Sequence, residues 1–141
     1  MYLIYPIAVS ILLASLHVSS SGAADTLNIR DLKFNVVSYQ LKMITLHGAV
    51  RGLKVLPPHF DERGSRGCTV YGSYTFTLVD ESGEVDVQKI GRCFDIQNKP
   101  PVSEGDAVSV RGQVQFFHPG ASGAQAPTVR LEAQEVVKIG L

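Results

Sequence analysis

The 141-residue sequence has no excess of charge of either sign, since 13 Lys and Arg residues balance 13 Asp and Glu residues. Binding to nucleic acid or to an anionic membrane depends on a positive field. The balance therefore argues against strong electrostatic binding of either kind. The length allows one domain, and a hydrophobic content of 45% is enough for a core that needs no metal or cofactor. We expect no cofactor.

The sequence also lacks the usual motifs of catalytic and metal sites. It has no Gly-x-Ser-x-Gly segment, and its two cysteines have neither the Cys-x-x-Cys spacing of redox catalysts nor the Cys-x-x-Cys-His spacing of haem attachment. His47, His59 and His118 do not form a pair with the spacing of a known metal site. We expect a protein that is not an enzyme and holds no metal.

The first 24 residues contain no Asp, Glu, Lys or Arg. An apolar run at 2–16 precedes a small and polar stretch at 18–24, which is the order of a secretory signal peptide. Gly22 and Ala24 are small, as signal peptidase requires, so we predict a signal peptide at 1–24, one domain at 25–141 and a periplasmic or secreted location. The run is shorter than the ~20 residues of a spanning helix. An uncleaved anchor stays open, since no positive residue precedes the run.

Cys68 and Cys93 are the two cysteines of the predicted domain. Export would place them in an oxidising compartment, where pairing is the default for an even number. We therefore expect a Cys68–Cys93 disulfide. In a reducing compartment the same residues would be two small buried hydrophobic side chains.

Two-residue periodicity dominates the predicted domain and indicates strands that each bury one face. We expect strands at 41–56, 68–78, 85–90, 108–116 and 129–134. A loop at 59–67 follows the first strand, and an irregularity at Val136 and Val137 follows the last. We expect a short helix or an irregular turn before the strands, with Asn28 as the candidate N-cap and apolar residues at Ile29, Leu32, Val36 and Val37.

Five such strands would leave unpaired edges in a flat sheet, and closure into a barrel removes them. Gly48 and Gly112 lie at inward positions, where a missing side chain permits a bend or the close approach of another strand. Residues 39–50 and 104–114 each run into a strand that ends in a Gly-x-Val step. In these segments the chain resembles the OB-fold family, in particular small exported bacterial OB domains of the nucleic-acid-binding type. The resemblance implies an all-β, five-stranded OB-type Greek-key barrel.

The resemblance also implies that a ligand would lie across the second and third strands and the flanking loops. Alternation selects the outward side chains there, which also include Thr77. The candidate ligand-binding residues are His47, Arg51, Thr69, Tyr71, Ser73, Thr75, Asp86 and Gln88. The competing interpretation is a solvated, threonine-rich strand face without a ligand.

These features favour a non-enzymatic exported binding module for a small ligand, a glycan or a protein. One alternative is a structural or assembly component of a cell-envelope complex, and another is a weak single-stranded nucleic-acid binder, which the charge balance disfavours. A continuous apolar patch near Phe60 and Phe117 would favour the assembly role. A concave polar face around Tyr71 would favour ligand binding.

Overall fold

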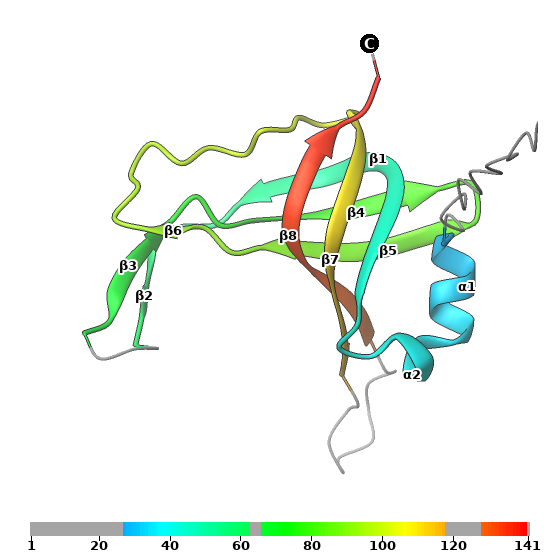
Figure 1. Ribbon diagram of the computed structural model, residues 1–141. Helices are drawn as coiled ribbons and strands as arrows, with labels where there is room; N and C mark the ends of the chain where they lie inside the picture. Colours follow the sequence, from blue (N-terminus) through cyan, green and yellow to red (C-terminus); the bar gives the residue numbers. More distant parts are fainter. Residues whose placement is uncertain (1–26, 63–65, 118–127, 141) are drawn as a thin grey trace, which may run out of the picture.

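The computed structural model contains a closed five-stranded barrel with the strand order β1-β4-β5-β8-β7 (Figure 1). Its strands are β1 (Met43–Val55), β4 (Tyr74–Asp80), β5 (Gly83–Lys89), β7 (Ala107–Phe117) and β8 (Thr128–Lys138). All neighbouring strands are antiparallel except β5 and β8, which are parallel. The predicted OB-type Greek-key barrel is confirmed.

The structure describes residues 27–62, 66–117 and 128–140, so the predicted signal peptide at 1–24 lies outside the described residues. Within the described ranges, no helix has the length and apolar character needed to cross a membrane.

The barrel core consists of the inward side chains that the two-residue period predicts. Leu46, Val50, Leu78, Val108 and Leu131 are fully buried. Side chains between them on the same strands point outward and are half-buried or exposed. Each strand therefore contributes one apolar face to a shared interior, which removes apolar surface from water and stabilises the fold.

Two inward glycines permit neighbouring strands to approach closely. A Cβ atom at Gly48 would lie 2.6 Å from the carbonyl oxygen of Val79, and one at Gly112 would lie 2.5 Å from that of Glu132. Real Cβ atoms do not come so close to backbone atoms, so both positions require glycine at this strand spacing. The predicted close approach is confirmed at both sites.

A short helical segment covers the end of the barrel at the turn between β4 and β5 (Figure 1). It comprises α1 (Ile29–Phe34) and α2 (Val36–Tyr39). Asn28 is the N-cap, as predicted, and its side-chain oxygen accepts a hydrogen bond from the Asp31 N–H at 2.8 Å. Ile29 and Leu32 are fully buried in the barrel core, whereas Val37, predicted to share their face, is 78% exposed because α1 ends before it.

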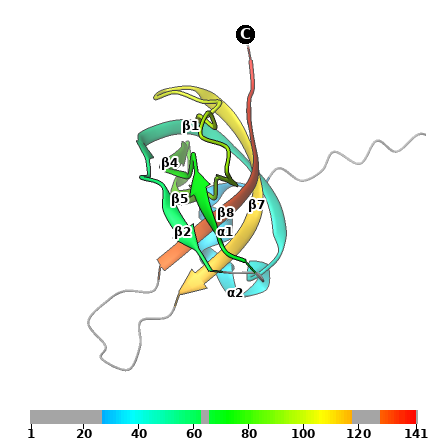
Figure 2. The same ribbon diagram turned by 90° about the vertical axis from the view of Figure 1, so that its left-hand side faces the viewer.

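A separate three-stranded sheet lies at the opposite end of the barrel and faces the viewer in Figure 2. Its strands are β2 (His59–Asp61), β3 (Cys68–Tyr71) and β6 (Arg92–Cys93), in the order β2-β3-β6. The Cys68–Cys93 disulfide joins β3 to β6 and confirms the predicted pairing. The prediction that 59–67 is only a loop is wrong, since β2 pairs with β3 there.

Two further strand predictions need correction. The strand predicted at 68–78 is interrupted at Gly72, where a φ of 72° separates β3 from β4. The irregularity predicted at Val136 and Val137 lies instead at Gln134, which has no partner because Arg111 pairs with Glu135 and Gly112 with Ala133. The alternation of polar and apolar residues continues across Gly72 and does not reveal the first break. At the second site, Gln134 and Glu135 are two polar residues in succession between Ala133 and Val136, which is the local mark of the bulge.

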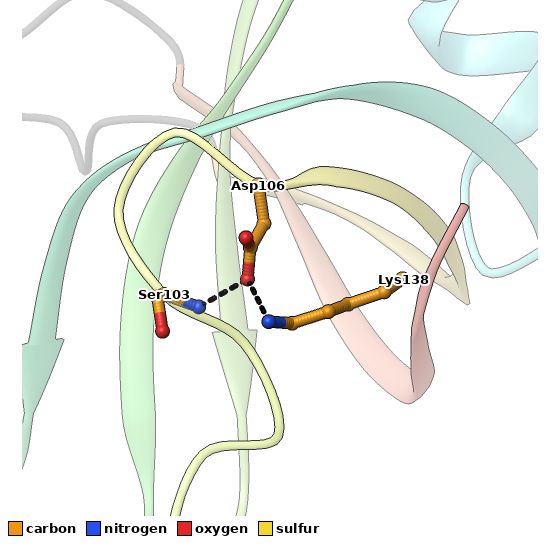
Figure 3. Close-up of polar contacts among 3 residues, drawn as sticks. All are labelled: Ser103, Asp106 and Lys138. Carbon is orange, nitrogen blue, oxygen red and sulfur yellow. Dashed lines mark hydrogen bonds and ion pairs between the residues drawn. The ribbon is translucent and has the colours of Figure 1, made fainter. Parts of the chain in front are cut away.

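Residues 94–106 connect β6 to β7 without a helix. Val102 of this segment is buried and covers the barrel end opposite α1. Asp106 fixes the end of the segment, because its carboxylate accepts hydrogen bonds from the Ser103 N–H at 2.6 Å and from Lys138 Nζ at 2.7 Å (Figure 3). Pro100 and Pro101 disfavour a helix in this segment.

Candidate functional site

A groove of about 300 Å³ crosses the outer face of β1, β4, β5 and β8. These four strands are neighbours in the barrel, so their outward side chains lie in rows perpendicular to the strands. We call this feature the strand-face groove. Its polar side chains are those of Lys54, Thr75, Thr77, Asp86, Gln88 and Arg130, and Gly52, Phe76 and Val87 complete the lining.

Strand register places the polar groups of the groove side by side. Thr77 lies opposite Asp86, which in turn lies opposite Arg130 on β8. The Thr77 hydroxyl donates a hydrogen bond to Asp86 Oδ1 at 3.3 Å. The second Asp86 carboxylate oxygen makes no hydrogen bond to a described residue and faces outward, so it is available to accept hydrogen bonds from a ligand.

Arg130 lies between Gln88 and Phe117. Its Nη1 donates a hydrogen bond to Gln88 Oε1 at 3.0 Å, and its guanidinium carbon is 5.7 Å from the centre of the Phe117 ring. Both contacts restrict the guanidinium, which therefore presents its remaining N–H groups in a defined place. Phe117 is 49% exposed and supplies an aromatic surface beside this end of the groove.

A bulge in β1 shapes the other end of the groove. The pairing of β1 with β4 shifts between Arg51 and Lys54, and Gly52 has a φ of 63°. The Glu104 carboxylate accepts hydrogen bonds from the N–H groups of Gly52 at 2.9 Å and Leu53 at 3.1 Å. These bonds and the positive charge of Arg51 hold the pKa of Glu104 below its ordinary value, although some desolvation opposes the shift. The bulge thereby turns Lys54 into the groove.

The groove contains three of the eight predicted site residues: Thr75, Asp86 and Gln88. Thr77, the further outward residue of the predicted second strand, also lines it. Arg51 is exposed on β1 opposite Thr77 but does not line the groove. The structure thus brings the central residues of the predicted face together on β4 and β5.

The remaining predicted site residues lie elsewhere. His47 lines a different cavity with Asp80 and Ser82 at the α1 end of the barrel. Thr69 and Tyr71 are half-buried on β3 in the three-stranded sheet. The prediction that Ser73 points outward is wrong.

Ser73 is 1% exposed because it lies in the break between β3 and β4, where Gly72 has a φ of 72°. Tyr74 and Phe76 beyond the break keep their predicted inward positions. Its hydroxyl accepts a hydrogen bond from the Gly91 N–H at 2.9 Å. Its carbonyl oxygen accepts another from the Leu56 N–H at 2.8 Å. Ser73 therefore ties β1 and the end of β5 to β4 and has a structural role.

Two charged residues of the groove, Lys54 and Arg130, are not among the predicted site residues. Alternation does indicate that Arg130 points outward on its strand. Nothing local indicates that β8 lies beside β5, because the two strands are about 40 residues apart and pair in parallel. An unbroken two-residue period would place the Lys54 side chain inward, but the β1 bulge shifts the period so that Lys54 points outward.

No protein-family model matches the sequence, and no curated protein is significantly similar to it. A protein assigned as an aspartyl-tRNA synthetase from Leishmania major Friedlin is 14% identical with a TM-score of 0.49, over 86% of this chain and 22% of that chain. A small single-stranded DNA-binding protein from Streptomyces coelicolor is 14% identical with a TM-score of 0.40, over 69% of this chain and 93% of that chain. This chain thus spans about a fifth of the synthetase. At such low similarity, the fold of this chain follows from its own strand order.

Proposed function

We propose that this protein is an exported, non-enzymatic OB-fold binding module whose strand-face groove binds a glycan. The observation that carries the proposal is the convergence of hydroxyl, carboxylate, amide and guanidinium groups from four neighbouring strands on one groove. Sites of this kind fix the orientation of a ligand through a few placed polar groups. Outer faces of OB barrels are surfaces on which oligosaccharides and oligonucleotides bind.

A glycan fits the groups that line the groove. Sugar hydroxyls both donate and accept hydrogen bonds, so they match the Asp86 carboxylate as an acceptor and Lys54 and Arg130 as donors. Phe117, held beside Arg130, offers an exposed aromatic face for the apolar side of a sugar ring. The volume of about 300 Å³ lies at the lower end of the range for ligand pockets, so a short glycan segment is expected to fill it.

The disulfide supports an exported location. Disulfides form and persist in oxidising compartments and are rare in reducing ones. Cys68 and Cys93 are paired, and their bond joins two strands of the small sheet. A periplasmic or secreted protein is therefore the proposed context for binding.

Single-stranded nucleic acid is the second candidate ligand, and the charge of the groove disfavours it. Lys54 and Arg130 are opposed by Asp86, which leaves one net positive charge among the groove residues. Affinity for a phosphate backbone grows with the number of phosphates that cations neutralise. A glycan has no such requirement, so we rank it first.

An assembly role receives less support because the apolar patch that would favour it is not continuous. Phe60 is 63% exposed on β2, and Phe117 is 49% exposed at the end of β7. These two strand segments lie well apart in Figure 1. A partner that docks on both aromatic residues at once is therefore not expected.

The test is a glycan array probed with the purified protein, followed by NMR titration with the strongest hit. We expect saturable shifts of the Thr75, Thr77 and Gln88 amides. Asp86→Ala should weaken binding by about tenfold, because it removes a charged hydrogen-bonding partner. Glu84→Ala is the matched control, since it removes an exposed carboxylate from the same strand outside the groove.

An oligothymidine titration at two salt concentrations separates the two candidate ligands. Binding of oligothymidine that weakens steeply with salt, without any glycan hit, would replace the glycan by nucleic acid. Equal binding by Asp86→Ala and the unchanged protein would remove the groove as the site.

A further inference from the structure

A second cavity, of about 320 Å³, lies at the barrel end opposite α1. It is bounded by the ends of β4 and β5, by the segment after β6 and by the bulge of β8. We call it the barrel-end cavity. Its polar lining includes Tyr74, Lys89, Arg92, Asn98, Lys99 and Glu135.

Three cationic side chains line this cavity against one carboxylate. Lys89 ends β5, Arg92 begins β6, and Lys99 lies in the segment after β6. Within the described part of the chain, none of the three makes an ion pair or a side-chain hydrogen bond. Cations that converge without a protein partner create a local positive potential that favours an anion.

Lys89 has an unusual position for a lysine. Val85 and Val87 precede it on the core-facing side of β5 and are 2% and 1% exposed. The strand period places Lys89 on the same side, at the last position before the barrel ends. Its ammonium therefore enters the cavity from the core side, whereas Gln88, one residue earlier, points into the strand-face groove.

Tyr74 contributes a hydroxyl that has no hydrogen-bond partner among residues 27–62, 66–117 and 128–140. The residue is 3% exposed, and its hydroxyl makes no hydrogen bond to any described residue. No fully buried side-chain polar atom of the described residues lacks a partner, so the Tyr74 hydroxyl is not fully buried. Tyr74 lines the cavity, which is where its hydroxyl can meet a ligand. Burial raises the pKa of this hydroxyl, which therefore stays protonated and able to donate.

The backbone around the cavity is held in place before any ligand binds. Gly72 has a φ of 72°, and its lack of a side chain allows the Asn98 backbone to pack against it. Asn98 Nδ2 donates a hydrogen bond to the Tyr71 carbonyl oxygen at 3.2 Å. Cys93 of the disulfide follows Arg92 directly, so the covalent bond fixes the strand that carries this cation. Such preorganisation lowers the entropic cost of binding.

We propose that the barrel-end cavity binds a small anionic ligand in which one phosphate or carboxylate group is joined to hydroxyl groups. The three cations and the Tyr74 hydroxyl would bind the oxyanion. Glu135 directly follows Gln134, the unpaired residue of the β8 bulge, and also lines the cavity. Its carboxylate would accept hydrogen bonds from the hydroxyl groups of the ligand and would repel a second anionic group on it. Sugar phosphates and sugar acids have this combination of groups.

The test is an NMR titration at constant ionic strength with glucose 6-phosphate, gluconate, inorganic phosphate and glucose. We expect glucose 6-phosphate or gluconate to shift the amides of Lys89, Arg92 and Lys99 with saturation. Inorganic phosphate should bind more weakly at the same amides, and glucose should not bind. Asp86→Ala, which alters the strand-face groove, should leave this binding unchanged.

Two variants and one control separate the site from general surface attraction. Lys89→Gln should weaken binding of the anionic sugar about tenfold, and Tyr74→Phe about threefold, because each removes one donor to the oxyanion. Tyr74→Phe keeps the buried ring. Lys42→Gln removes an exposed cation outside the cavity and should have no effect.

Three outcomes would overturn the proposal. One is non-saturating shifts spread over all surface cations. Another is unchanged binding in both Lys89→Gln and Tyr74→Phe. The third is that the NMR signals of the cavity amides shift only with oligothymidine or with phosphatidylglycerol vesicles. The cations would then bind the phosphates of a nucleic acid or of a lipid surface and not a small anionic ligand.

Discussion

The Glu104 carboxylate is bound to the Gly52 N–H at 2.9 Å, across 52 residues of sequence. The same carboxylate binds the Leu53 N–H, so one side chain from the segment before β7 satisfies both donors that the β1 bulge leaves unpaired. This bulge also forms one end of the strand-face groove. The groove therefore depends on a residue that lies outside it.

Replacing Glu104 by alanine should loosen the bulge. The Gly52 and Leu53 amides lose their acceptor, so we expect their hydrogen exchange to accelerate by about tenfold, the equivalent of one lost hydrogen bond to a charged group. Amides in the middle of β7 should not change. Glu84→Ala is the control because Glu84 is exposed and its side chain has no hydrogen bond to a described residue. Unchanged exchange at Gly52 and Leu53 would show that water replaces the carboxylate without loss.

Acid should destabilise the fold partly through Asp80. Burial alone would raise the pKa of this carboxyl, but hydrogen bonds from Ser82, Ile29 and Gly83 outweigh it and lower the pKa below the ordinary 3.8. The folded state thus favours the carboxylate. Its contribution is fully present well above pH 3.8 and is lost as the pH falls through the lowered folded value.

Urea unfolding between neutral pH and about pH 3 measures this dependence. Asp80→Asn should make the free energy of unfolding less sensitive to pH. It should also weaken the attachment of α1, whose first N–H donates to Asp80 Oδ2 at 2.9 Å. Glu81→Gln, at the neighbouring exposed position, should retain the pH sensitivity of the unchanged protein. The same acid response in both variants would argue against a role for Asp80.

Loss of the disulfide should destabilise the small sheet more than the barrel. The bond closes a loop with a sequence separation of 25 residues, which corresponds to roughly 3 kcal/mol of stabilisation by loop entropy. We expect a Cys68→Ala, Cys93→Ala double variant to lose about this free energy of unfolding. Its strand content, measured by circular dichroism, should stay almost constant. A change of the whole spectrum would show that the barrel needs the small sheet to fold.

Gly48 should not tolerate a side chain. Gly48→Ala would bring a Cβ atom to 2.6 Å from the Val79 carbonyl oxygen on the neighbouring strand. We expect a loss of about 2 kcal/mol in the free energy of unfolding, as for other overpacked cores. Gly83→Ala is the matched control, because its nearest neighbour would be a methyl group of Ile29 at 3.6 Å, an ordinary contact. Equal stability of the two variants would mean that β1 and β4 can separate freely.

Much of the fold could be predicted from local patterns. Alternation identified the inward residues of β1 and β7, and Asn28 marked the start of α1, because strand period and helix capping depend on neighbouring residues. Ser73 shows the limit of this reasoning. Its apparent outward position depends on an unbroken period, and the break at Gly72 is enough to bury it.

The candidate site could be predicted only in part for a related reason. Thr75, Asp86 and Gln88 belong to one hairpin, whose register follows from a short turn. Arg130 joins them only because the barrel closes through a parallel pairing of β5 with β8. Such long-range pairing leaves no trace in the local sequence.

The sequence by itself determined which side of each strand is apolar, where the short helix begins and which cysteines can pair, since these depend on residue type and near neighbours. Tertiary structure alone decided that Lys89, Arg92 and Lys99 surround one cavity and that Lys54 and Arg130 share a groove. The physical reason is that strand order and bulges set the distance between outward side chains, and both result from closing the barrel around its core.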